Sequence, residues 1–453
     1  MMEFLFGSVA TRVLRGAFAL ALLGLTPLIG PQIASATEAS RDVTTLHSAL
    51  EQLTREGKFS GAVVVYGAEG VRFAHGYGLA DPFSQRRFTP ETPVDSASLA
   101  KPVTAAAVLS LAKEGKIDLD KPVRHYLRGY PHEATTVRHL LAHAAGLPPE
   151  EDLEPLADKT NERIINEIAA RHLPPTFTPG TAFNYCNFCY TTLALLIERV
   201  SGTSYLALVQ KRLALPAGVT IRPLHLADWP DRAIGYRRTS EGKIERADSY
   251  ESEAFYGSAN LSISASQLAR WGAEWWKAQL APIRTRAVEP ARIAGKPSGL
   301  SWGNWYCSSK GKQCHYLGHH EGFHHMLYWD AERRISVAMV SNNTLAPGRQ
   351  QRLQRALVAF AEKRTTEGLD DLRSDLPDNP VQSGTYVLPT AETVVVSSDD
   401  NRVSVVRSGI PYPAYRIGAG IRYVPGLDTY LAGAADGRLH WLNLYEDMLG
   451  DPK

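Results

Sequence analysis

The stretch Ser96-Ala-Ser-Leu-Ala-Lys-Pro-Val-Thr-Ala105 decides how the rest of the chain is interpreted. Ser96 can cap a helix, and Pro102 falls in the first turn, where a missing N–H does little harm. Residues three apart share one face of a helix, so Ser98 and Lys101 are expected to touch where this helix begins.

A serine hydroxyl and an amine at this spacing indicate nucleophilic chemistry. The hydroxyl needs a base, and a lysine with a solution pKa of about 10.4 serves only when it is deprotonated. Burial in a cleft and the positive end of a helix both disfavour its charge. The same helix end directs N–H groups to the place where an oxyanion would form. Taken alone, S-x-x-K also fits a simple surface pair.

Tyr185-Cys-Asn187 is the second candidate element, and it precedes a helix predicted over residues 190–200. A tyrosine near a neutral lysine can relay a proton between nucleophile and leaving group, and Asn187 can donate to a substrate carbonyl. The alternative is that Tyr185 and Phe188 are aromatic packing at a helix entry.

Together these stretches resemble the class C-like branch of the serine β-lactamase and penicillin-binding-protein superfamily, with its D-Ala-D-Ala carboxypeptidases and family-VIII-type esterases. The resemblance covers roughly residues 42–363 and rests on ordered matches at characteristic separations. Besides the two stretches above, the matches are Gly115-Lys-Ile-Asp-Leu-Asp-Lys-Pro-Val123, His139-Leu-Leu-Ala-His-Ala-Ala-Gly-Leu-Pro148, Pro179-Gly180 and Gly257-Ser-Ala-Asn-Leu-Ser-Ile-Ser264.

The resemblance implies a serine hydrolase of carboxypeptidase or esterase type that needs no cofactor. Ser98 would form an acyl-enzyme with a D-amino-acid peptide, a β-lactam or an ester, and Lys101 and Tyr185 would move protons. The expected partner is therefore a small-molecule or peptide substrate. The alternative function is a catalytically weak penicillin-binding or sensor-like protein that uses the same cleft.

The third motif of the family is where this chain departs, because the family expects K-T-G, H-x-G or a variant on an edge strand. When the chain is aligned with the family pattern without a gap, the third motif falls on Tyr316-Leu-Gly318. The backbone N–H of His319 would then complete the oxyanion hole. A register with a short deletion places His319 in the basic position itself. Either register lacks a lysine, which favours esters over substrates held by a carboxylate.

The order of predicted elements indicates an α+β fold. Strand-like runs at residues 61–66 and 71–75 come first, mainly helical residues 98–290 follow, and strands return at residues 302–341. The simplest folding joins both strand groups in one antiparallel sheet, flanked by helices and an all-helical lobe, as in β-lactamases and transpeptidases. Within the helical part, helices are expected over residues 99–113, 136–144, 161–170 and 264–279, and further helices over residues 42–56 and 350–363.

Four segments are predicted. Residues 1–36 form a signal peptide, 37–365 the hydrolase domain, 366–380 a linker with two prolines, and 381–453 a small β-rich domain with short runs and frequent glycine.

The N-terminus reads as a secretory signal. Arg12 and Arg15 precede an uncharged run rich in Leu and Ala, and Ala34-Ser-Ala36 supplies small residues before a cleavage near Ala36. A retained anchor is the alternative, but two prolines and small polar residues interrupt the run, so no stable membrane anchor is expected after cleavage. The expected location is periplasmic or secreted.

An oxidising compartment makes disulfides plausible for the four cysteines, Cys186, Cys189, Cys307 and Cys314. Two local bridges and bridges between the pairs both remain open. A thioredoxin-like role would need a βαβ context that the sequence lacks.

Several other signals are weaker. Five histidines between His315 and His325 follow no metal-ligand spacing, so no metal is expected. His143 is expected to be a packed, hydrogen-bonded residue.

Ser301 lies in a G-x-S-x-G sequence but lacks the strand–turn–helix context of a nucleophile elbow. A net charge of +2 without a basic block argues against nucleic acid as a partner.

Overall fold

The computed structural model describes residues 30–153, 160–223, 230–239, 241–248, 255–277, 280–320, 322–363, 369, 372, 374–398 and 403–453. The predicted signal residues 1–29 and parts of the predicted linker lie outside these ranges. Residue contacts divide the chain into two units, Met1–Arg41 and Asp42–Lys453, and helix α1 (Gly30–Arg55) runs from the first into the second. Ala36 lies within α1. The second unit contains the central sheet, the helical lobe and a C-terminal barrel.

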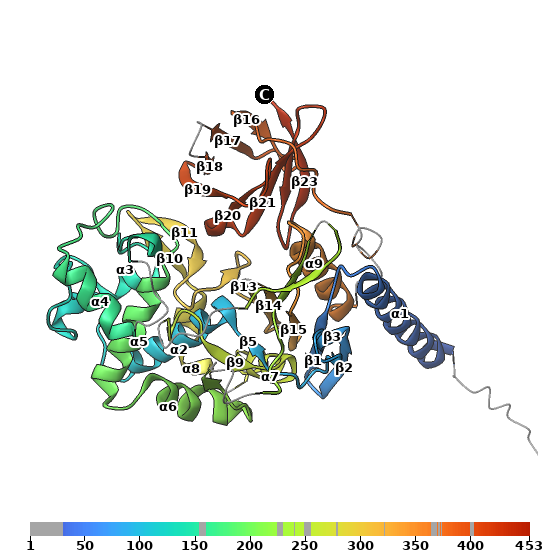
Figure 1. Cartoon of the computed structure of the whole chain (residues 1–453), viewed down its shortest axis with the longest axis horizontal. Coiled ribbons are helices and arrows are strands. Elements are labelled where there is room, and N and C mark those ends of the chain that lie inside the picture. Colours follow the sequence, from blue (N-terminus) through green and yellow to red (C-terminus); the bar gives the residue numbers. More distant parts are fainter. Residues whose placement is uncertain are drawn as a thin grey trace, which may run out of the picture. The chain divides into compact units, whose positions relative to one another are not determined.

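An eight-stranded antiparallel sheet forms the centre, in the order β10-β11-β12-β13-β14-β15-β1-β2 (Figure 1). Its strands are β1 (Gly61–Gly67), β2 (Gly70–Tyr77), β10 (Pro290–Ile293), β11 (Lys296–Ser301), β12 (Tyr306–Cys307), β13 (Gln313–His320), β14 (Phe323–Asp330) and β15 (Ile335–Ser341). β1 pairs with both β2 and β15, with Gly61 opposite Ser341. The prediction that early and late strands share one sheet is therefore confirmed.

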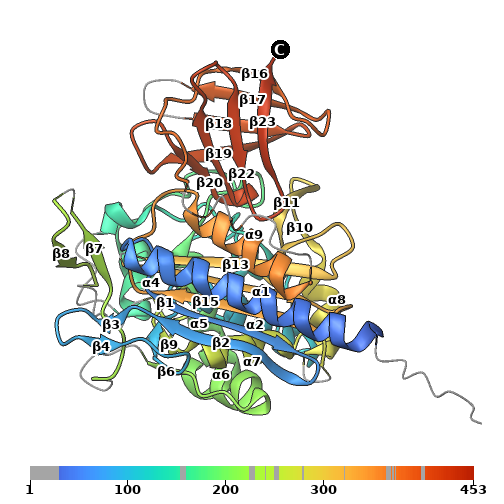
Figure 2. The same ribbon diagram turned by 90° about the vertical axis from the view of Figure 1, so that its right-hand side faces the viewer.

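Side chains of β1 alternate between two hydrophobic cores, as the period of two in a strand requires. Val63 and Val65 join the core that contains Leu46 and Leu50 of α1 and Leu353 of α9 (Arg349–Ala361). Figure 2 shows α9 lying across this face of the sheet. Ala62 and Val64 face the second core, which the helical lobe supplies.

The remaining helices cover the second core and form the helical lobe. They are α2 (Ala100–Lys113), α3 (Val137–Leu141), α4 (Asn161–Ala170), α5 (Asn187–Ser201), α6 (Tyr205–Val209), α7 (Ala265–Ala273) and α8 (Ala281–Val288). α2 is buried along most of its length and packs against α5 and α8. In the described residues no single helix has the length and apolar character to cross a membrane, whereas the bent pair Asn187–Ser201 and Tyr205–Ala217 meets these criteria jointly.

Three predicted helix boundaries were wrong. α3 ends at Leu141 rather than Ala144 because His143 has a left-handed φ of 55°. α7 begins as predicted, after a capping box at Ser264, but ends at Ala273 instead of Gln279. α5 begins at Asn187, three residues earlier than predicted, because the side chain of Cys186 caps it.

Residues 384–452 form a closed antiparallel barrel of eight consecutive strands. They are β16 (Gly384–Val387), β17 (Thr393–Ser398), β18 (Val403–Arg407), β19 (Ile410–Arg416), β20 (Arg422–Val424), β21 (Thr429–Gly433), β22 (Leu439–Leu442) and β23 (Asp447–Pro452). β23 pairs back onto β16, so the barrel leaves no open edge. Its interior is apolar and includes Val394, Val405, Leu431 and Trp441.

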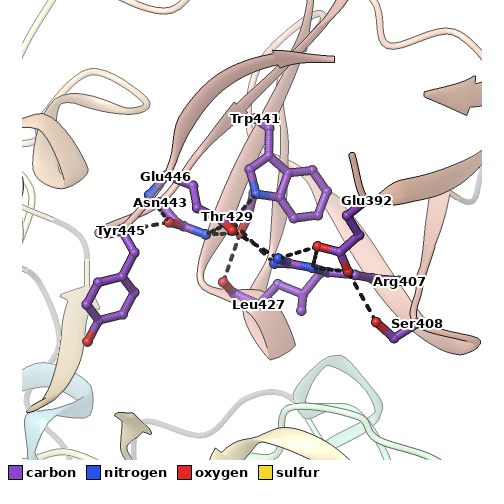
Figure 3. Close-up of polar contacts among 9 residues, drawn as sticks. All are labelled: Glu392, Arg407, Ser408, Leu427, Thr429, Trp441, Asn443, Tyr445 and Glu446. Atoms are coloured by element: carbon purple, nitrogen blue, oxygen red, sulfur yellow. Dashed lines mark hydrogen bonds and ion pairs between the residues drawn. The ribbon is translucent and has the colours of Figure 1, made fainter. Parts of the chain in front are cut away.

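A charged cluster ties together distant parts of this barrel (Figure 3). The guanidinium of Arg407 donates to Glu392 at 2.7 Å and to Glu446 at 2.9 Å, and it lies 5.2 Å from the ring centre of Trp441. The indole N–H of Trp441 also donates to Glu446, at 2.8 Å. The two carboxylates therefore satisfy the polar groups of a half-buried arginine and connect β18 to the β22–β23 turn.

Candidate active site

Ser98 lies in a short 3₁₀ turn (Ala97–Leu99) between strand β5 (Val94–Asp95) and helix α2. Ala97 has a left-handed φ of 46°, an uncommon conformation for a non-glycine residue. The carboxylate of Asp95 accepts a hydrogen bond from the Ala97 N–H at 2.8 Å and holds this conformation. Burial opposes ionisation of Asp95, but His320 and the Ala97 N–H outweigh it and lower its pKa. The turn presents the Ser98 side chain at the cleft.

Lys101 lies one helical turn after Ser98 and is fully buried. Its Nζ donates to Ser98 Oγ at 2.9 Å and to the carbonyl oxygen of Ser258 at 3.0 Å. Both partners are uncharged. The amine is therefore oriented toward the serine hydroxyl by the segment that precedes strand β9 (Leu261–Ile263).

Tyr185 completes the group from the other side of the cleft. Its hydroxyl donates to Ser98 Oγ at 2.8 Å, and its ring centre lies 4.8 Å from Lys101 Nζ. The structure thus brings together the three residues that were selected from the sequence, although 87 positions separate Tyr185 from Ser98.

His143 holds Tyr185 in place. The two rings are stacked, with centres 4.7 Å apart and planes 16° from parallel. Nδ1 of His143 accepts from the Cys186 N–H at 3.0 Å, so Nε2 carries the proton and donates to Asn304 Oδ1 at 3.1 Å. Burial, with a smaller effect from Lys101, lowers the pKa of His143 to about 3. His143 is therefore neutral and packed, as its sequence context predicted.

The cysteines form two local disulfides, Cys186–Cys189 and Cys307–Cys314. The second joins the paired strands β12 and β13. The first lies directly between Tyr185 and α5, and Cys186 Sγ accepts from the Cys189 N–H. Of the two arrangements that the sequence left open, the structure therefore has the two local bridges. The Cys186–Cys189 bridge belongs to the candidate site.

Tyr316 of β13 contacts the same group, since its hydroxyl lies 3.3 Å from that of Tyr185. Two positions on, Gly318 approaches the Ser98 turn so closely that a Cβ there would lie 3.0 Å from Leu99 N and Ser96 O. Burial strongly raises the pKa of Tyr316. The gapless register therefore places an uncharged phenol where a basic residue is expected.

His319 also lines the cleft, in ring contact with Tyr423 of the barrel at 5.7 Å between centres. The side chain is exposed along the cleft, and desolvation there lowers its pKa, an effect that Asp428 partly opposes. His319 is therefore an uncharged part of the wall at neutral pH.

Asn187 begins helix α5 and lines the cleft. From the sequence, its amide was expected to donate to a substrate carbonyl. In the structure Nδ2 donates instead to a carboxylate oxygen of Glu150 at 2.5 Å. Glu150 also lines the cleft and was missed, because it follows the Gly146-Leu-Pro-Pro149 segment without a motif of its own.

The cleft has a volume of about 460 Å³. The barrel contributes Tyr415, Ile417, Tyr423 and Pro425 to its wall, residues that no motif in the sequence singled out. The hydroxyl of Tyr415 donates to Asn184 Oδ1 at 2.7 Å, and Asp428 bonds His315 at 2.8 Å and Tyr423 at 3.0 Å. The barrel is therefore joined to the hydrolase domain beside Ser98.

Three other histidines of the 315–325 segment make separate contacts. His315 binds Asp428, His320 lies 3.4 Å from the Asp95 carboxylate, and His325 donates to the Asp95 carbonyl at 2.5 Å. Within the described ranges, no three His, Cys, Asp or Glu side chains are placed to hold a metal ion. Ser301 Oγ accepts from the Trp305 N–H, and strand β12 rather than a helix follows it.

A serine that accepts hydrogen bonds from a buried lysine and a tyrosine, at the start of a helix beside an antiparallel sheet, defines the serine β-lactamase and penicillin-binding-protein superfamily. The beta-lactamase family model matches residues 46–361. The chain therefore belongs to the beta-lactamase family, whose members include serine hydrolases.

Similar proteins cover different shares of the chain. Penicillin-binding protein 4* of Bacillus subtilis is 30% identical over 181 residues, which are 38% of this chain and 40% of that protein. A D-aminopeptidase of Brucella anthropi is 30% identical over 199 residues, 43% and 37% of the two chains. The matches thus span about two-fifths of these relatives' lengths. A penicillin-binding protein homologue from Pyrococcus abyssi, described as octameric, has a TM-score of 0.60 at 21% identity and covers 90% of this chain and 99% of its own.

Proposed function

We propose that the protein is an exported serine acyl-hydrolase that cleaves amide or ester bonds through an acyl-enzyme on Ser98. The observation that carries the proposal is the pair of hydrogen bonds to Ser98 Oγ, from Lys101 at 2.9 Å and from Tyr185 at 2.8 Å. These contacts place a base and a proton relay within reach of one nucleophile, which is the geometry that this chemistry needs.

In the acylation step, Lys101 acts as the base and accepts the Ser98 proton while Oγ attacks the substrate carbonyl carbon. Backbone N–H groups of Ser98 and His319 stabilise the oxyanion of the tetrahedral intermediate. The proton then passes through Tyr185 to the leaving amine or alcohol as the scissile bond breaks. In deacylation the same groups take a proton from water, whose oxygen attacks the ester, and return it to Ser98 Oγ. Protons balance over the cycle, and no cofactor takes part.

Ester and D-amino-acid amide or peptide bonds are the favoured substrates. Tyr316 gives the third motif no cation to hold a substrate carboxylate, which disfavours β-lactams and carboxypeptidase substrates. The similarity to a D-aminopeptidase supports the same choice.

Export is proposed on the basic residues Arg12 and Arg15, the apolar run after them and the small residues before Ala36. The two local disulfides fit an oxidising compartment. N-terminal sequencing of the mature protein is expected to show a start near residue 37, and recovery of the intact N-terminus from the cytoplasm would contradict export.

Parallel assays test the reaction class. A nitrophenyl ester, a D-amino-acid amide, a D-Ala-D-Ala peptide and a chromogenic cephalosporin are offered to the wild type and to Ser98→Ala. We expect turnover of the first two, abolished by the substitution. Stoichiometric binding of penicillin without turnover of any substrate would favour the sensor-like alternative.

A further inference from the structure

Asp428 is a buried acidic residue of the barrel that reaches the hydrolase domain. It follows the short 3₁₀ turn Pro425–Leu427 and is 1% exposed, and its backbone has a left-handed φ of 46°. This conformation is uncommon for a residue with a side chain, and it persists only where the surrounding structure holds it. Both of its carboxylate oxygens have partners next to the cleft, so the side chain is fixed there.

One carboxylate oxygen holds the beginning of residues 315–319 of β13, which we call the third-motif segment. Oδ2 lies 2.8 Å from Nε2 of His315, a buried side chain directly before Tyr316. Nδ1 of His315 lies 3.1 Å from the hydroxyl of Tyr445, another residue of the C-terminal domain. Both ring nitrogens of His315 therefore bond to the barrel, and the ring cannot turn without breaking a hydrogen bond.

The other carboxylate oxygen holds the end of the same segment. Oδ1 accepts a hydrogen bond from the Tyr423 hydroxyl at 3.0 Å, and the Tyr423 ring meets the His319 ring edge-on, with centres 5.7 Å apart. Burial and the Asp428 carboxylate hold the pKa of Tyr423 well above its ordinary value, so the hydroxyl keeps the proton that it donates. One side chain of the barrel is therefore connected to both ends of the third-motif segment.

The part of the segment between these contacts faces the nucleophile. The Tyr316 hydroxyl lies 3.3 Å from that of Tyr185, and Gly318 packs closely against the backbone of the Ser98 turn. In the proposed mechanism the backbone N–H of His319 is one of the two oxyanion donors. Such a donor must lie about 2.7–3.1 Å from the oxyanion, and a misplacement of about 1 Å costs on the order of 100-fold in rate. The position of β13 relative to Ser98 is therefore critical.

We infer that Asp428 is a positioning residue for the acyl transfer, because through His315 and Tyr423 it holds the third-motif segment at the distance from Ser98 that stabilises the oxyanion. This role rests on the proposed chemistry at Ser98 and adds a residue of the barrel to it. Asp428 does not line the cleft, so it acts through its two partners and not on the substrate.

The test measures the strength of the oxyanion interaction. A nitrophenyl ester and its thionoester differ only in the carbonyl oxygen, which sulfur, a weak hydrogen-bond acceptor, replaces. The ratio of kcat/KM for the ester to kcat/KM for the thionoester therefore reports on the oxyanion donors. Asp428→Ala is expected to lower this ratio at least fivefold and to lower kcat for the ester about 10- to 100-fold, with KM changed less than about threefold.

A second variant and a control complete the series. Asp428→Asn keeps the size of the side chain and an acceptor for Tyr423, but it turns an NH₂ group toward His315. It replaces Asp428→Ala if that variant does not fold, and a lower ratio is expected for it too. Asp436→Asn changes a barrel aspartate that is 52% exposed and lies outside the cleft, and it should keep the wild-type ratio.

The outcomes separate this role from the proposed function. If Ser98 reacts in the wild type and the ester-to-thionoester ratio is the same in both Asp428 variants, Asp428 only supports the fold, and the inference is refuted while the acyl-enzyme stands. An equal loss of rate with both substrates leads to the same conclusion. If a fluorophosphonate does not label Ser98 in the wild type and neither substrate turns over, the proposed function fails and the positioning role fails with it.

Discussion

Ser98 Oγ accepts hydrogen bonds from Lys101 and Tyr185, and different parts of the structure hold these two donors in place. Lys101 is fixed by helix α2 and by the Ser258 carbonyl, whereas Tyr185 depends on the stacked ring of His143. The base and the proton relay of the proposed mechanism are therefore positioned by separate parts of the fold. Removing either donor should slow the reaction without unfolding the protein.

Tyr185→Phe is expected to lower kcat by about 10²–10⁴-fold, because general acid–base catalysis contributes that much. The aromatic ring and its stacking on His143 remain, so the thermal midpoint should stay within a few degrees of the wild-type value. Steady-state assays with an ester and an amide measure the effect. Tyr126→Phe, outside the cleft, is the control, and an undiminished kcat in Tyr185→Phe would remove Tyr185 from the mechanism.

Single residues of the site differ in how well sequence predicted them. Ser98 and Lys101 are neighbours on one helical turn, so their contact follows from local geometry. Tyr185 was found through the ordered family matches. Glu150 was missed because its significance comes from Asn187, 37 residues later, and no local pattern encodes that contact.

Helix α5 connects the Cys186–Cys189 disulfide to the candidate site. Its first residue is Asn187, and the residue that caps it, Cys186, follows Tyr185 directly. The bridge therefore fixes the backbone that carries both side chains. The Cys307–Cys314 bridge instead joins β12 to β13.

Reduction of the first bridge is expected to lower activity at least several-fold, since it frees the backbone on which Tyr185 and Asn187 depend. The measurement is ester turnover with and without dithiothreitol. A Cys307→Ser, Cys314→Ser double variant should remain sensitive to the reductant, and Cys186→Ser, Cys189→Ser should be less active and insensitive. Sensitivity that persists after loss of Cys186 and Cys189 would disprove this assignment.

The sheet and most helices followed from residue patterns, but helix ends did not. Periodicity predicted α4 and nearly all of α9, whereas α3 and α5 depend on features that periodicity does not contain. Helix α3 ends because His143 has a left-handed backbone conformation, and helix α5 begins after the disulfide-bonded cap residue Cys186. Both deviations lie at the candidate site, where tertiary contacts override local preference.

At the level of the whole chain, the barrel is part of the cleft wall. Tyr415 and Ile417 are 41% and 42% exposed and face the cleft that contains Ser98. Its strands were foreseen from short β-rich runs with glycine, but the residues that reach the cleft were not, because their position depends on how two domains pack. The barrel therefore lines the cleft in addition to closing its own sheet.

Tyr415→Ala and Ile417→Ala are each expected to widen the cleft. The ratio of kcat/KM for a bulky ester to that for an acetyl ester should rise about threefold or more, because steric exclusion is relieved. Val395→Ala, on β17 and outside the cleft, should leave the ratio unchanged. An unchanged ratio in both cleft variants would argue against a selective role for the barrel.

Buried histidines make the stability of the whole chain pH-dependent. Burial lowers the pKa of His143 to about 3 and of His325 to about 4, from an ordinary value of 6.5. The unfolded chain therefore binds more protons between pH 6.5 and 4, so the free energy of unfolding is highest above pH 6.5 and falls as the pH drops through this interval. Thermal unfolding at pH 7.5, 6, 5 and 4 should show a falling midpoint. His325→Gln should show a shallower fall, and a slope equal to that of the wild type would contradict this origin.

The contact of Ser98 with Lys101 and Tyr185 is the feature on which the proposed chemistry depends. Time-resolved intact-mass and peptide mapping after a fluorophosphonate probe measures it most directly. We expect one adduct, on the peptide that contains Ser98, absent in Ser98→Ala and formed at least 100-fold more slowly in Lys101→Ala. An adduct on Ser301, or labelling of Lys101→Ala at the wild-type rate, would contradict the proposed chemistry.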